Sequence, residues 1–351
     1  MRRALDLAWQ GWGRVHPNPL VGAVVLAHDE VVGEAFHAEF GAGHAEPLAL
    51  ASAGGRARGA TLVSTLEPCN HQGKQPACTE AILRAGVRRV VAALADPNPI
   101  AAGGAERLRA AGVDVQLGLM AEDAGRQNAA FLHILRDPSR PYVALKLATS
   151  LDFRIADRDG RSRWVSGPEA REYVHWLRAG FDGIAVGVGT ARADDPRLSV
   201  RGAVEVRVPP ARIVFDRRLE LPNDLGLVRT AAEARTLVIA EPGAPAARAA
   251  ALGALGVQVL HASDPRDALQ QLRLSGVTAL LVEGGGRLAG ALLEADLVDR
   301  FHWIQAPLWL GDRGVPAVRG LASPPIVDAS RWEIVERRAL GEDTLMVVDR
   351  A

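Results

Sequence analysis

The apolar and polar positions of the first 135 residues alternate in short segments, each with the period of a helix or of a strand. Helical spacing in the opening run MRRALDLAWQGWG predicts an amphipathic helix and argues against a signal peptide. Two β-rich runs, VGAVVL and VVGEAF, surround a polar turn and predict a hairpin. Farther on, the predicted helices HAEPLALASA (from about His44), TEAILRAG and AERLRAAG alternate with the predicted strands ATLVST, RRVVAAL and VDVQLG, before a closing helix through Phe131 and Leu135. This alternation favours a mostly parallel sheet with helices on both faces.

The segment RDPSRPY, residues 136–142, begins no periodic pattern and contains two prolines, so we predict a linker there. Strand–helix alternation resumes directly after it with YVALKLATS. The length of 351 residues also exceeds what one hydrophobic core usually spans. We therefore predict two α/β domains, residues 1–138 and 139–351.

The composition narrows the class of protein further. Apolar residues make up 48% of the chain and charged residues 23%, which is typical of a globular protein. Lysine plus arginine and aspartate plus glutamate balance at 41 each, so no overall field attracts nucleic acid or a membrane surface. No apolar stretch has the length that a bilayer demands. We expect a cytoplasmic protein with reduced thiols, which weighs against a disulfide between Cys69 and Cys78, the chain's two cysteines.

Both cysteines lie in one polar loop, LEPCNHQGKQPAC, and the motif HAE precedes it. His44, Cys69 and Cys78 supply one imidazole and two thiolates, a ligand set that suits tetrahedral zinc with water in the fourth position. Such a metal lowers the pKa of bound water and creates a nucleophile, and Glu46 is placed to shuttle protons to a leaving amine. Cys78 directly precedes a predicted helix, whose N-terminus favours a thiolate. His44 and Glu46 diverge by about 200° in mid-helix, so they share one centre only at a helix start.

Other interpretations of these residues stay open on local pattern alone. The two cysteines can coincide by chance, or can bind structural zinc with His71 as the fourth ligand. H-x-E by itself is a weak signal that many helices carry as surface residues. Together, H-x-E, P-C and a second cysteine before a helix match the motif of zinc-dependent base deaminases, whose usual C-x-x-C spacing is here expanded to C-x8-C. That expansion points to a narrower family.

The motifs HPNPLVGAVV, GHAEPLAL, LEPCNHQGKQPAC and ADPNP occur in order, and the N-terminal half resembles the deaminase domain of the bifunctional riboflavin-biosynthesis deaminase/reductases. That family carries an expanded P-C-x-H-x-G-x-x-P-x-C loop. The second half continues the resemblance through LKLATSLD, RWVSGPEAR, ADDPRLSVR and VEGGGRLAGALL, so it covers nearly the whole chain. The resemblance implies a three-layer α/β cytidine-deaminase-like domain followed by a three-layer α/β dihydrofolate-reductase-like domain.

Two consecutive reactions are implied by this resemblance. The first domain would hydrolyse the 2-amino group of 2,5-diamino-6-ribosylamino-4(3H)-pyrimidinone 5′-phosphate. One zinc ion per chain would bind to His44, Cys69 and Cys78, with Glu46 as the proton shuttle. The second domain would then use NADPH to reduce the ribosyl group to ribityl, by hydride transfer to C1′ of an imine-like species.

Several features of the second half suit this reductase role. The sequence SGPE at residues 166–169 predicts a helix start with a capping box. The run LLVEGGGRLAGALLEA predicts a buried strand that enters three glycines and opens a helix, where backbone N–H groups can face a phosphate; a tight strand–helix turn is the alternative. Lys146 stands in the apolar strand VALKLA, and its alternative is an edge-strand lysine that faces solvent. Arg178 and Arg201 are ordinary surface arginines on local pattern alone, but by resemblance they bracket the substrate phosphate.

The resemblance also implies two sets of ligand-binding residues. The cofactor set comprises Ala148, Trp164, Thr190, Asp194, Arg217, Gly285, Gly286, Arg287, Leu288, Ala289, Gly290 and Ala291. The substrate set comprises Asn18 and His71 in the deaminase domain and Lys146, Ser162, Arg178, Leu198, Arg201 and Glu283 in the reductase domain. Arg217, with Arg218, is expected to grip the 2′-phosphate that distinguishes NADPH from NADH. For His71, an ordinary loop histidine is the alternative.

The chain departs from the family pattern at a few positions. Phe153 replaces the glycine of the family's SLDG motif in a cofactor-side loop, which strains the chain if this position needs a positive φ. Gln75 replaces the usual threonine, and the chain starts so close to its first helix that we expect it to lack a short N-terminal extension. Phe153 keeps open a second hypothesis, a single-activity enzyme that is either a deaminase with a non-reducing C-terminal domain or the reverse.

A third hypothesis is a zinc-stabilised binding protein without turnover, in which His71 closes the zinc site. A nucleic-acid base deaminase shares the zinc motif, but the balanced charge argues against it. We expect an enzyme of small molecules that binds neither nucleic acid nor a membrane. By resemblance, we also expect a homo-oligomer, either a dimer or a tetramer.

Overall fold

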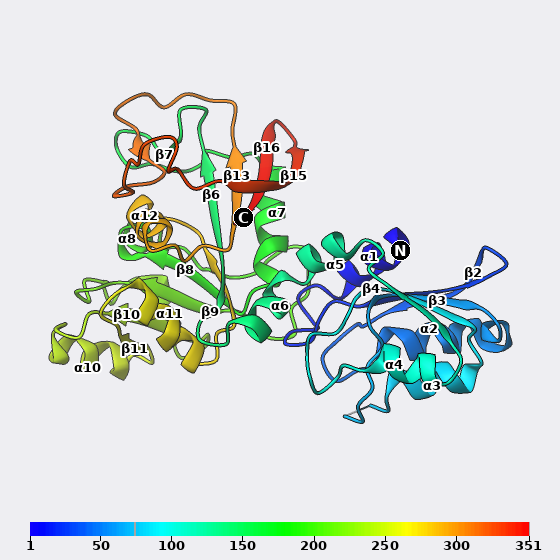
Figure 1. Ribbon diagram of the computed structural model, residues 1–351. Helices are drawn as coiled ribbons and strands as arrows, with labels where there is room; N and C mark the ends of the chain where they lie inside the picture. Colours follow the sequence, from blue (N-terminus) through cyan, green and yellow to red (C-terminus); the bar gives the residue numbers. More distant parts are fainter. Residues whose placement is uncertain (74, 351) are drawn as a thin grey trace. The chain divides into compact units, whose positions relative to one another are not determined.

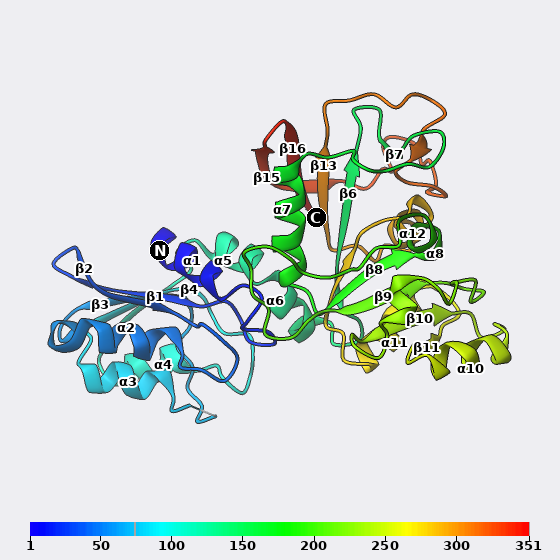
Figure 2. The same cartoon turned by 180° about the vertical axis from the view of Figure 1, so that it is seen from behind.

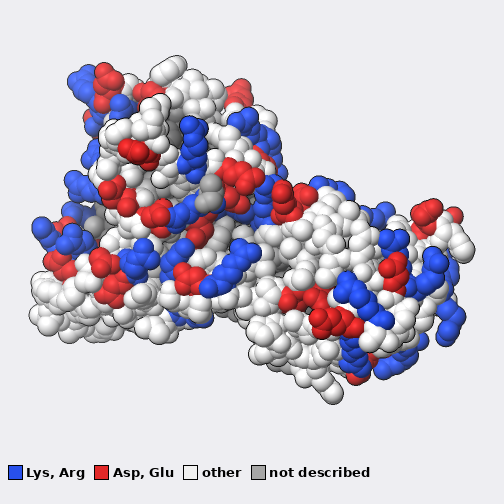
Figure 3. All heavy atoms as spheres, viewed as in Figure 1, with Lys and Arg blue, Asp and Glu red and all other residues white. Residues whose placement is uncertain are grey.

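The computed structural model describes residues 1–73 and 75–350. The chain divides into two compact units, Met1–Asp137 and Pro138–Ala351, and each has its own sheet and core. Among the described residues, no helix combines the length and the apolar character needed to cross a bilayer. On the face shown in Figure 3, basic and acidic side chains are interspersed over both units, in keeping with the balanced composition.

The first unit is a five-stranded sheet between two layers of helices (Figure 1). Its strands are β1 (Gly22–Ala27), β2 (Glu30–Phe36), β3 (Thr61–Leu66), β4 (Arg89–Leu94) and β5 (Asp114–Leu117), in the order β2-β1-β3-β4-β5. Its helices are α1 (Arg2–Ala8), α2 (Ala45–Ala53), α3 (Cys78–Ala85), α4 (Gly104–Ala110), α5 (Ala121–Gln127) and α6 (Ala129–Arg136), with short 3₁₀ helices at Trp9–Gly11 and Gly54–Ala57. β1 is antiparallel to β2 and β3, whereas β3, β4 and β5 are parallel. The predicted hairpin and the alternation that follows it are confirmed.

The alternation of side chains along each strand explains why helices cover both faces of this sheet. On one face, Val25 and Leu62 belong to a core that also contains buried residues of α2, α3 and α4. On the other face, Val24 and Val63 pack against Ala4 of α1. Because α2 and α3 share a face and contact each other, the residues at their N-termini can meet near the end of β3.

The second unit is built on a nine-stranded sheet. Its strands are β6 (Tyr142–Thr149), β8 (Gly183–Gly187), β9 (Ala211–Phe215), β10 (Thr236–Ala240), β11 (Gln258–His261), β12 (Ala279–Val282), β13 (Arg300–Gln305), β15 (Trp332–Leu340) and β16 (Asp343–Arg350), and β7 (Arg154–Ala156) pairs separately with β14 (Val315–Pro316). Its helices are α7 (Pro168–Ala179), α8 (Val188–Asp194), α9 (Gly226–Arg229), α10 (Ala246–Ala254), α11 (Pro265–Leu274) and α12 (Gly286–Glu294).

The strand order of the second unit is β11-β10-β9-β8-β12-β6-β13-β16-β15. The strands from β11 to β13 are parallel, and β16 and β15 extend the sheet in antiparallel fashion. One apolar cluster joins the sheet to α11 and α12, and a second joins the opposite face to α8, α9 and α10. The predicted three-layer α/β class is therefore confirmed for this unit as well. The carboxyl ends of the parallel strands form one edge, where ligands bind in open α/β sheets.

Lys146 lies in a central strand of this sheet, not in an edge strand. β6 lies between β12 and β13, so the alternative of an edge-strand lysine is wrong. Its partner in the register of β13 is His302, and the hydroxyl group of Tyr173 from α7 lies 2.8 Å from His302 Nδ1. Figure 2 shows α7 running beside β6 and β13. Lys146 therefore stands in the centre of the sheet, on the face that α7 covers.

The start of α7 confirms the predicted helix but not its capping box. Pro168 is the first helical residue, as predicted, but Gly167 occupies the N-cap position and no side chain caps the helix. Because Ser166 stands one residue too early, its hydroxyl group cannot take the capping role, and its carbonyl accepts a hydrogen bond from Arg171 instead. The backbone N–H of Gly167 donates to Asp343 of β16 at 2.7 Å. A contact from a distant strand thus replaces the local cap.

Phe153 has a positive φ, the conformation that would explain the glycine at this position of the family motif. Its φ is +60°, in the left-handed region that favours glycine. The side chain packs against the core of the second unit, and its ring meets that of Trp303 edge-on at 5.4 Å between centroids. The side chain is thus directed to the core, and Phe153 is not among the residues that line the large cavity of this unit.

We expect the substitution Phe153→Gly to lower the free energy of unfolding by about 1 kcal/mol. The lost packing of a partly buried ring, about 2–3 kcal/mol, exceeds the relief of the left-handed backbone, about 1–2 kcal/mol. Thermal unfolding with a parallel NADPH-oxidation assay checks this, and we expect the reductase rate to change less than about twofold. A faster reductase in the glycine variant would contradict this account, since it would mean that the phenylalanine impairs catalysis.

Candidate active sites

The first candidate site lies where two helices begin and one strand ends in the first unit. His44 is the N-cap residue of α2, with an extended backbone, and Glu46 lies in the first turn of that helix. Cys78 is the first residue of α3, and Cys69 follows β3 in the connecting loop. The helix start allows His44 and Glu46 to face one centre, as the sequence analysis required. Local helix geometry therefore positions three of these four side chains.

The distances among the three proposed ligands fit a metal ion. His44 Nδ1 lies 3.2 Å from Cys78 Sγ and 3.5 Å from Cys69 Sγ. The ligand atoms all lie within 4.8 Å of one another, and the described residues contain no other such group of three or more. Tetrahedral zinc with Zn–S and Zn–N bonds of about 2.3 and 2.0 Å holds its ligand atoms about 3.5 Å apart. The donor set and its spacing therefore fit zinc, with one position left for water.

The charges around this centre suit its chemistry. The hydrogen bond from the Cys78 thiol, followed by that of His44, lowers the pKa of Cys69 to about 4, so a thiolate forms readily. The carboxyl group of Glu46 is buried, with 3% of its surface exposed, and burial raises its pKa to about 7. Its Oε2 accepts a hydrogen bond from the Cys78 thiol at 3.4 Å, and its Oε1 accepts one from Ser64 at 3.5 Å. A group that titrates near neutrality is suited to giving and taking protons.

His44, Glu46 and Cys69 line a pocket of about 300 Å³. Both substrate residues predicted in this unit, Asn18 and His71, line it. Asn18 Nδ2 lies 3.0 Å from Nε2 of the buried His37, whose Nδ1 lies 3.0 Å from the Gly43 carbonyl. His71 lines the pocket but does not belong to the cluster of three ligand atoms. The geometry therefore favours an open metal site over a closed one.

Four polar or ionisable residues that line this pocket were not predicted from the sequence: His37, Glu67, Asp96 and Asn98. Glu67 accepts hydrogen bonds from the backbone N–H groups of Asp96 at 2.9 Å and of Ala105 at 2.8 Å, which ties the cysteine loop to the segment after β4. Asp96 and Asn98 belong to the motif ADPNP, residues 95–99. That motif was the available signal for these two residues, whereas no local pattern marks His37.

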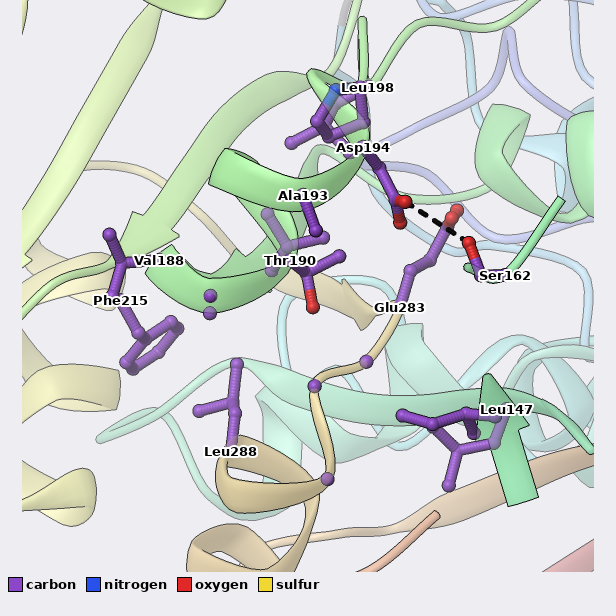
Figure 4. Close-up of a pocket in the computed structure, with 18 of the residues that line it drawn as sticks. Leu147, Ser162, Val188, Thr190, Ala193, Asp194, Leu198, Phe215, Glu283 and Leu288 are labelled. Carbon is purple, nitrogen blue, oxygen red and sulfur yellow. Dashed lines mark hydrogen bonds between the residues drawn. The ribbon is translucent and has the colours of Figure 1, made fainter. Parts of the chain in front are cut away.

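The second candidate site is a cavity of about 1,920 Å³ at the carboxyl ends of the parallel strands of the second unit (Figure 4). All six reductase-domain substrate residues line it: Lys146, Ser162, Arg178, Leu198, Arg201 and Glu283. The cofactor residues that line it are Ala148, Trp164, Thr190, Asp194, Arg217, Gly285, Gly286, Arg287, Leu288 and Ala291. Ala289 and Gly290 are not among the lining residues. Ala289 is buried in the core, and a Cβ atom at Gly290 would lie 1.9 Å from the carbonyl oxygen of Arg319.

A turn of glycines lines this cavity directly before α12 begins. Gly284 and Gly285 have φ values of +110° and +81°, and a Cβ atom at Gly285 would lie 3.1 Å from Thr190 Oγ1. Figure 4 shows Thr190 on α8 on one side of this space and Leu288 of α12 on the other. Backbone N–H groups at the N-terminus of α12 can therefore meet an anionic group that enters between the two helices. The donors fit the phosphates of a dinucleotide.

A buried ion pair forms one wall of the cavity. Arg178 donates to both carboxylate oxygens of Glu283, at 2.5 and 2.7 Å, and also to the carbonyl of Ser199 at 2.9 Å. The side chains are only 11% and 8% exposed. Burial raises the pKa of Glu283, but Arg178 outweighs it and the pKa falls below its ordinary value. Burial lowers the pKa of Lys146, and the charge of Glu283 opposes that shift. Two cations and one anion thus share the substrate side of the cavity.

Other side chains complete the walls. Ser162 donates a hydrogen bond to Asp194 at 3.1 Å, as drawn in Figure 4. The ring of Trp164 is 69% exposed, and the Arg171 guanidinium lies 4.6 Å from its centre. Arg217 also lines the cavity, is largely exposed and pairs with Glu241 at 2.9 Å. Apart from Ala289 and Gly290, the predicted cofactor residues therefore come from separate segments of the second unit that converge on one cavity.

Two family models match the chain. The cytidine and deoxycytidylate deaminase zinc-binding region matches residues 1–94, and the RibD C-terminal domain matches residues 141–346. Both halves therefore carry a recognised catalytic domain, which neither the single-activity hypothesis nor the binding-protein hypothesis explains.

Relatives of full length support the same assignment. The riboflavin biosynthesis protein RibD of Escherichia coli is 39% identical in an alignment 376 positions long, which covers 99% of this chain and 97% of the relative. That of Aquifex aeolicus is 39% identical over 325 residues, covering 91% and 90%. RibD of Acinetobacter baumannii superposes with a TM-score of 0.85 at 33% identity, covering 100% of this chain and 97% of that one. A diaminohydroxyphosphoribosylaminopyrimidine deaminase/5-amino-6-(5-phosphoribosylamino)uracil reductase of Thermotoga maritima gives 0.85 at 31% identity with the same coverage.

These matches confirm the resemblance seen in the motifs. The chain belongs to the RibD family of riboflavin-biosynthesis proteins and combines a zinc-dependent deaminase with an NADPH-dependent reductase.

Proposed function

We propose that this chain removes the 2-amino group of 2,5-diamino-6-ribosylamino-4(3H)-pyrimidinone 5′-phosphate and then reduces the ribosyl group of the product to ribityl. The observation that carries this proposal is the cluster of His44, Cys69 and Cys78 beside a buried Glu46, in a chain that also holds a large phosphate-suited cavity. A time course tests the order: ammonia should appear before NADPH is oxidised. NADPH oxidation that precedes ammonia release would contradict it.

In the deaminase site, His44, Cys69 and Cys78 would hold zinc, which would supply a water-derived nucleophile at neutral pH for the amino-bearing carbon. Glu46 accepts the proton of the attacking water and delivers it to the amine, which leaves as ammonia. Its low exposure keeps bulk water from competing for that proton. Asn18, held by His37, presents its amide at the pocket wall for the pyrimidine ring.

In the reductase site, bound NADPH would supply the hydride for C1′ of the opened ribosyl group. The turn at Gly284 and Gly285 and the N-terminus of α12 hold the cofactor's phosphates, with Thr190 beside them. The ammonium group of Lys146 positions the substrate from the centre of the sheet. Catalysis by the protein is then mainly orientation and electrostatics.

The substrate phosphate lies between Arg178 and Arg201 in this proposal. Hydrogen bonds to Glu283 and Ser199 use three of the five N–H groups that a guanidinium group has, so two of those of Arg178 remain for a phosphate. Glu283 thus orients Arg178 in addition to contacting the substrate.

The choice between NADPH and NADH tests the assignment of Arg217. We expect the double substitution Arg217→Ala with Arg218→Ala to raise the KM for NADPH about 10- to 100-fold, because charge-assisted hydrogen bonds to the 2′-phosphate are lost. The KM for NADH should stay nearly constant. Steady-state kinetics with both cofactors measure this, and Arg229→Ala, an exposed arginine that does not line the cavity, is the matched control. An unchanged cofactor preference would refute the assignment.

We also propose that the enzyme acts on small molecules in the cytoplasm as a homo-oligomer, a dimer or a tetramer. The family resemblance supports this, and light scattering of the purified protein tests the oligomeric state.

A further inference from the structure

One histidine of the reductase cavity has no role in the reaction described so far. His175 lies on α7, one turn before Arg178, and lines the cavity. The residue is half-buried, and its Nδ1 atom is buried without a hydrogen bond of normal geometry. Since Nδ1 is turned inward, the remaining edge of the ring, which carries Nε2, is the edge left to face the cavity.

The proposed phosphate site has less positive charge than a phosphate dianion needs. Arg178 is neutralised by Glu283 in the buried ion pair. Of the two arginines, only Arg201 then brings a positive charge that Glu283 does not already offset to a phosphate monoester, which carries about −1.5 to −2 charges at neutral pH. His175 is close enough to both arginines and to Glu283 for all three charges to shift its pKa. It therefore stands where an additional hydrogen-bond donor is needed.

We propose that His175 is a third phosphate-binding side chain of the reductase site and donates a hydrogen bond to the phosphate of the bound substrate. This inference rests on the proposed function, in which Arg178 and Arg201 bracket that phosphate. It assigns to α7 two phosphate ligands on one helical face, three residues apart.

The surroundings of His175 give this role a measurable signature. In the free enzyme, burial lowers its pKa, and the charges of Arg178 and Arg201 lower it further, while Glu283 and the Ser199 carbonyl act in the opposite direction. The net shift is downward, so the ring is neutral near pH 7.5 when the site is empty. A phosphate dianion beside the ring raises its pKa, because an opposite charge favours the charged form. Substrate binding therefore takes up a proton at His175.

Calorimetry tests this with the complete enzyme and the deaminated intermediate, in the absence of NADPH so that no reduction occurs. At pH 7.5 the phosphate is almost fully a dianion, so the dependence of the binding enthalpy on the buffer's ionisation enthalpy reports proton uptake by the protein. We expect uptake in the wild type, none in His175→Gln, and about tenfold weaker binding in that variant. The dephosphorylated intermediate should bind both proteins equally and without uptake.

The outcomes separate this inference from the function on which it rests. In Arg201→Ala, binding of the phosphorylated intermediate should also weaken, and the proton uptake should persist in reduced form. Weakening in Arg201→Ala together with unchanged affinity and uptake in His175→Gln would overturn the role of His175 alone. Unchanged binding in Arg201→Ala would overturn the phosphate site itself. Because the deaminase site lies in the other unit, ammonia release does not report on the folding of the second unit, and a thermal unfolding curve that matches the wild type shows that each variant is folded.

Discussion

Replacing Glu46 by glutamine should reduce ammonia release by a factor of about 10² to 10⁴, because glutamine fills the same space but cannot transfer a proton. The three metal ligands are untouched, so zinc content should stay at the wild-type level. The reductase should process added deaminated intermediate at the normal rate, since its cavity belongs to the other unit. Ammonia release, zinc mass spectrometry and NADPH oxidation measure the three properties.

Ser64→Ala is the matched control for this variant. Ser64 touches the same carboxylate, at 3.5 Å, but takes no part in proton transfer in this account. We expect its ammonia release to fall less than tenfold, which corresponds to at most about 1.4 kcal/mol. A Glu46→Gln enzyme as active as Ser64→Ala would mean that another group moves the proton.

Replacing Arg178 by methionine should lower the free energy of unfolding by about 3–5 kcal/mol, since it leaves the carboxylate of Glu283 buried without its partner. The reductase reaction should be lost at the same time, because the substrate phosphate loses one ligand and Glu283 loses its orientation. Ammonia release should persist. Chemical denaturation and the two activity assays measure these effects.

Two further variants isolate the buried ion pair. Arg178→Met combined with Glu283→Met should regain much of the stability but none of the reductase activity, because no unpaired charge is left in the wall. Arg192→Met removes an exposed pair with Glu220, at 3.8 Å, and should cost less than about 1 kcal/mol. Equal stability losses in Arg178→Met and Arg192→Met would contradict the view that the Arg178–Glu283 pair is a buried structural element.

The parts of the molecule that the sequence predicted well are those encoded by local pattern. The alternation of apolar runs predicted the class of both sheets, and the H-x-E and P-C motifs predicted the residues that meet at the zinc centre. At Phe153, the glycine of the family motif raised the question of whether this position needs a positive φ, and its φ is +60°. In each case the information lies within a few neighbouring residues.

The features that the sequence did not predict depend on residues far apart in the chain. The N-cap of α7 is held by Asp343, 176 residues away, so the local capping-box pattern was misleading. Arg178 and Glu283 are separated by 105 residues, and no periodicity relates them. His37 lies at the zinc pocket because the sheet brings the end of β2 beside α2. Strand order creates these contacts, and the order of nine strands cannot be derived from apolar periodicity.

Zinc content measured by mass spectrometry, together with ammonia release from the pyrimidinone phosphate in the presence and absence of NADPH, tests the central claim most directly. The account predicts one zinc ion per chain, ammonia release that does not need NADPH, and NADPH oxidation that follows it. Zinc without ammonia release would contradict the account, because the zinc site would then be structural and not catalytic.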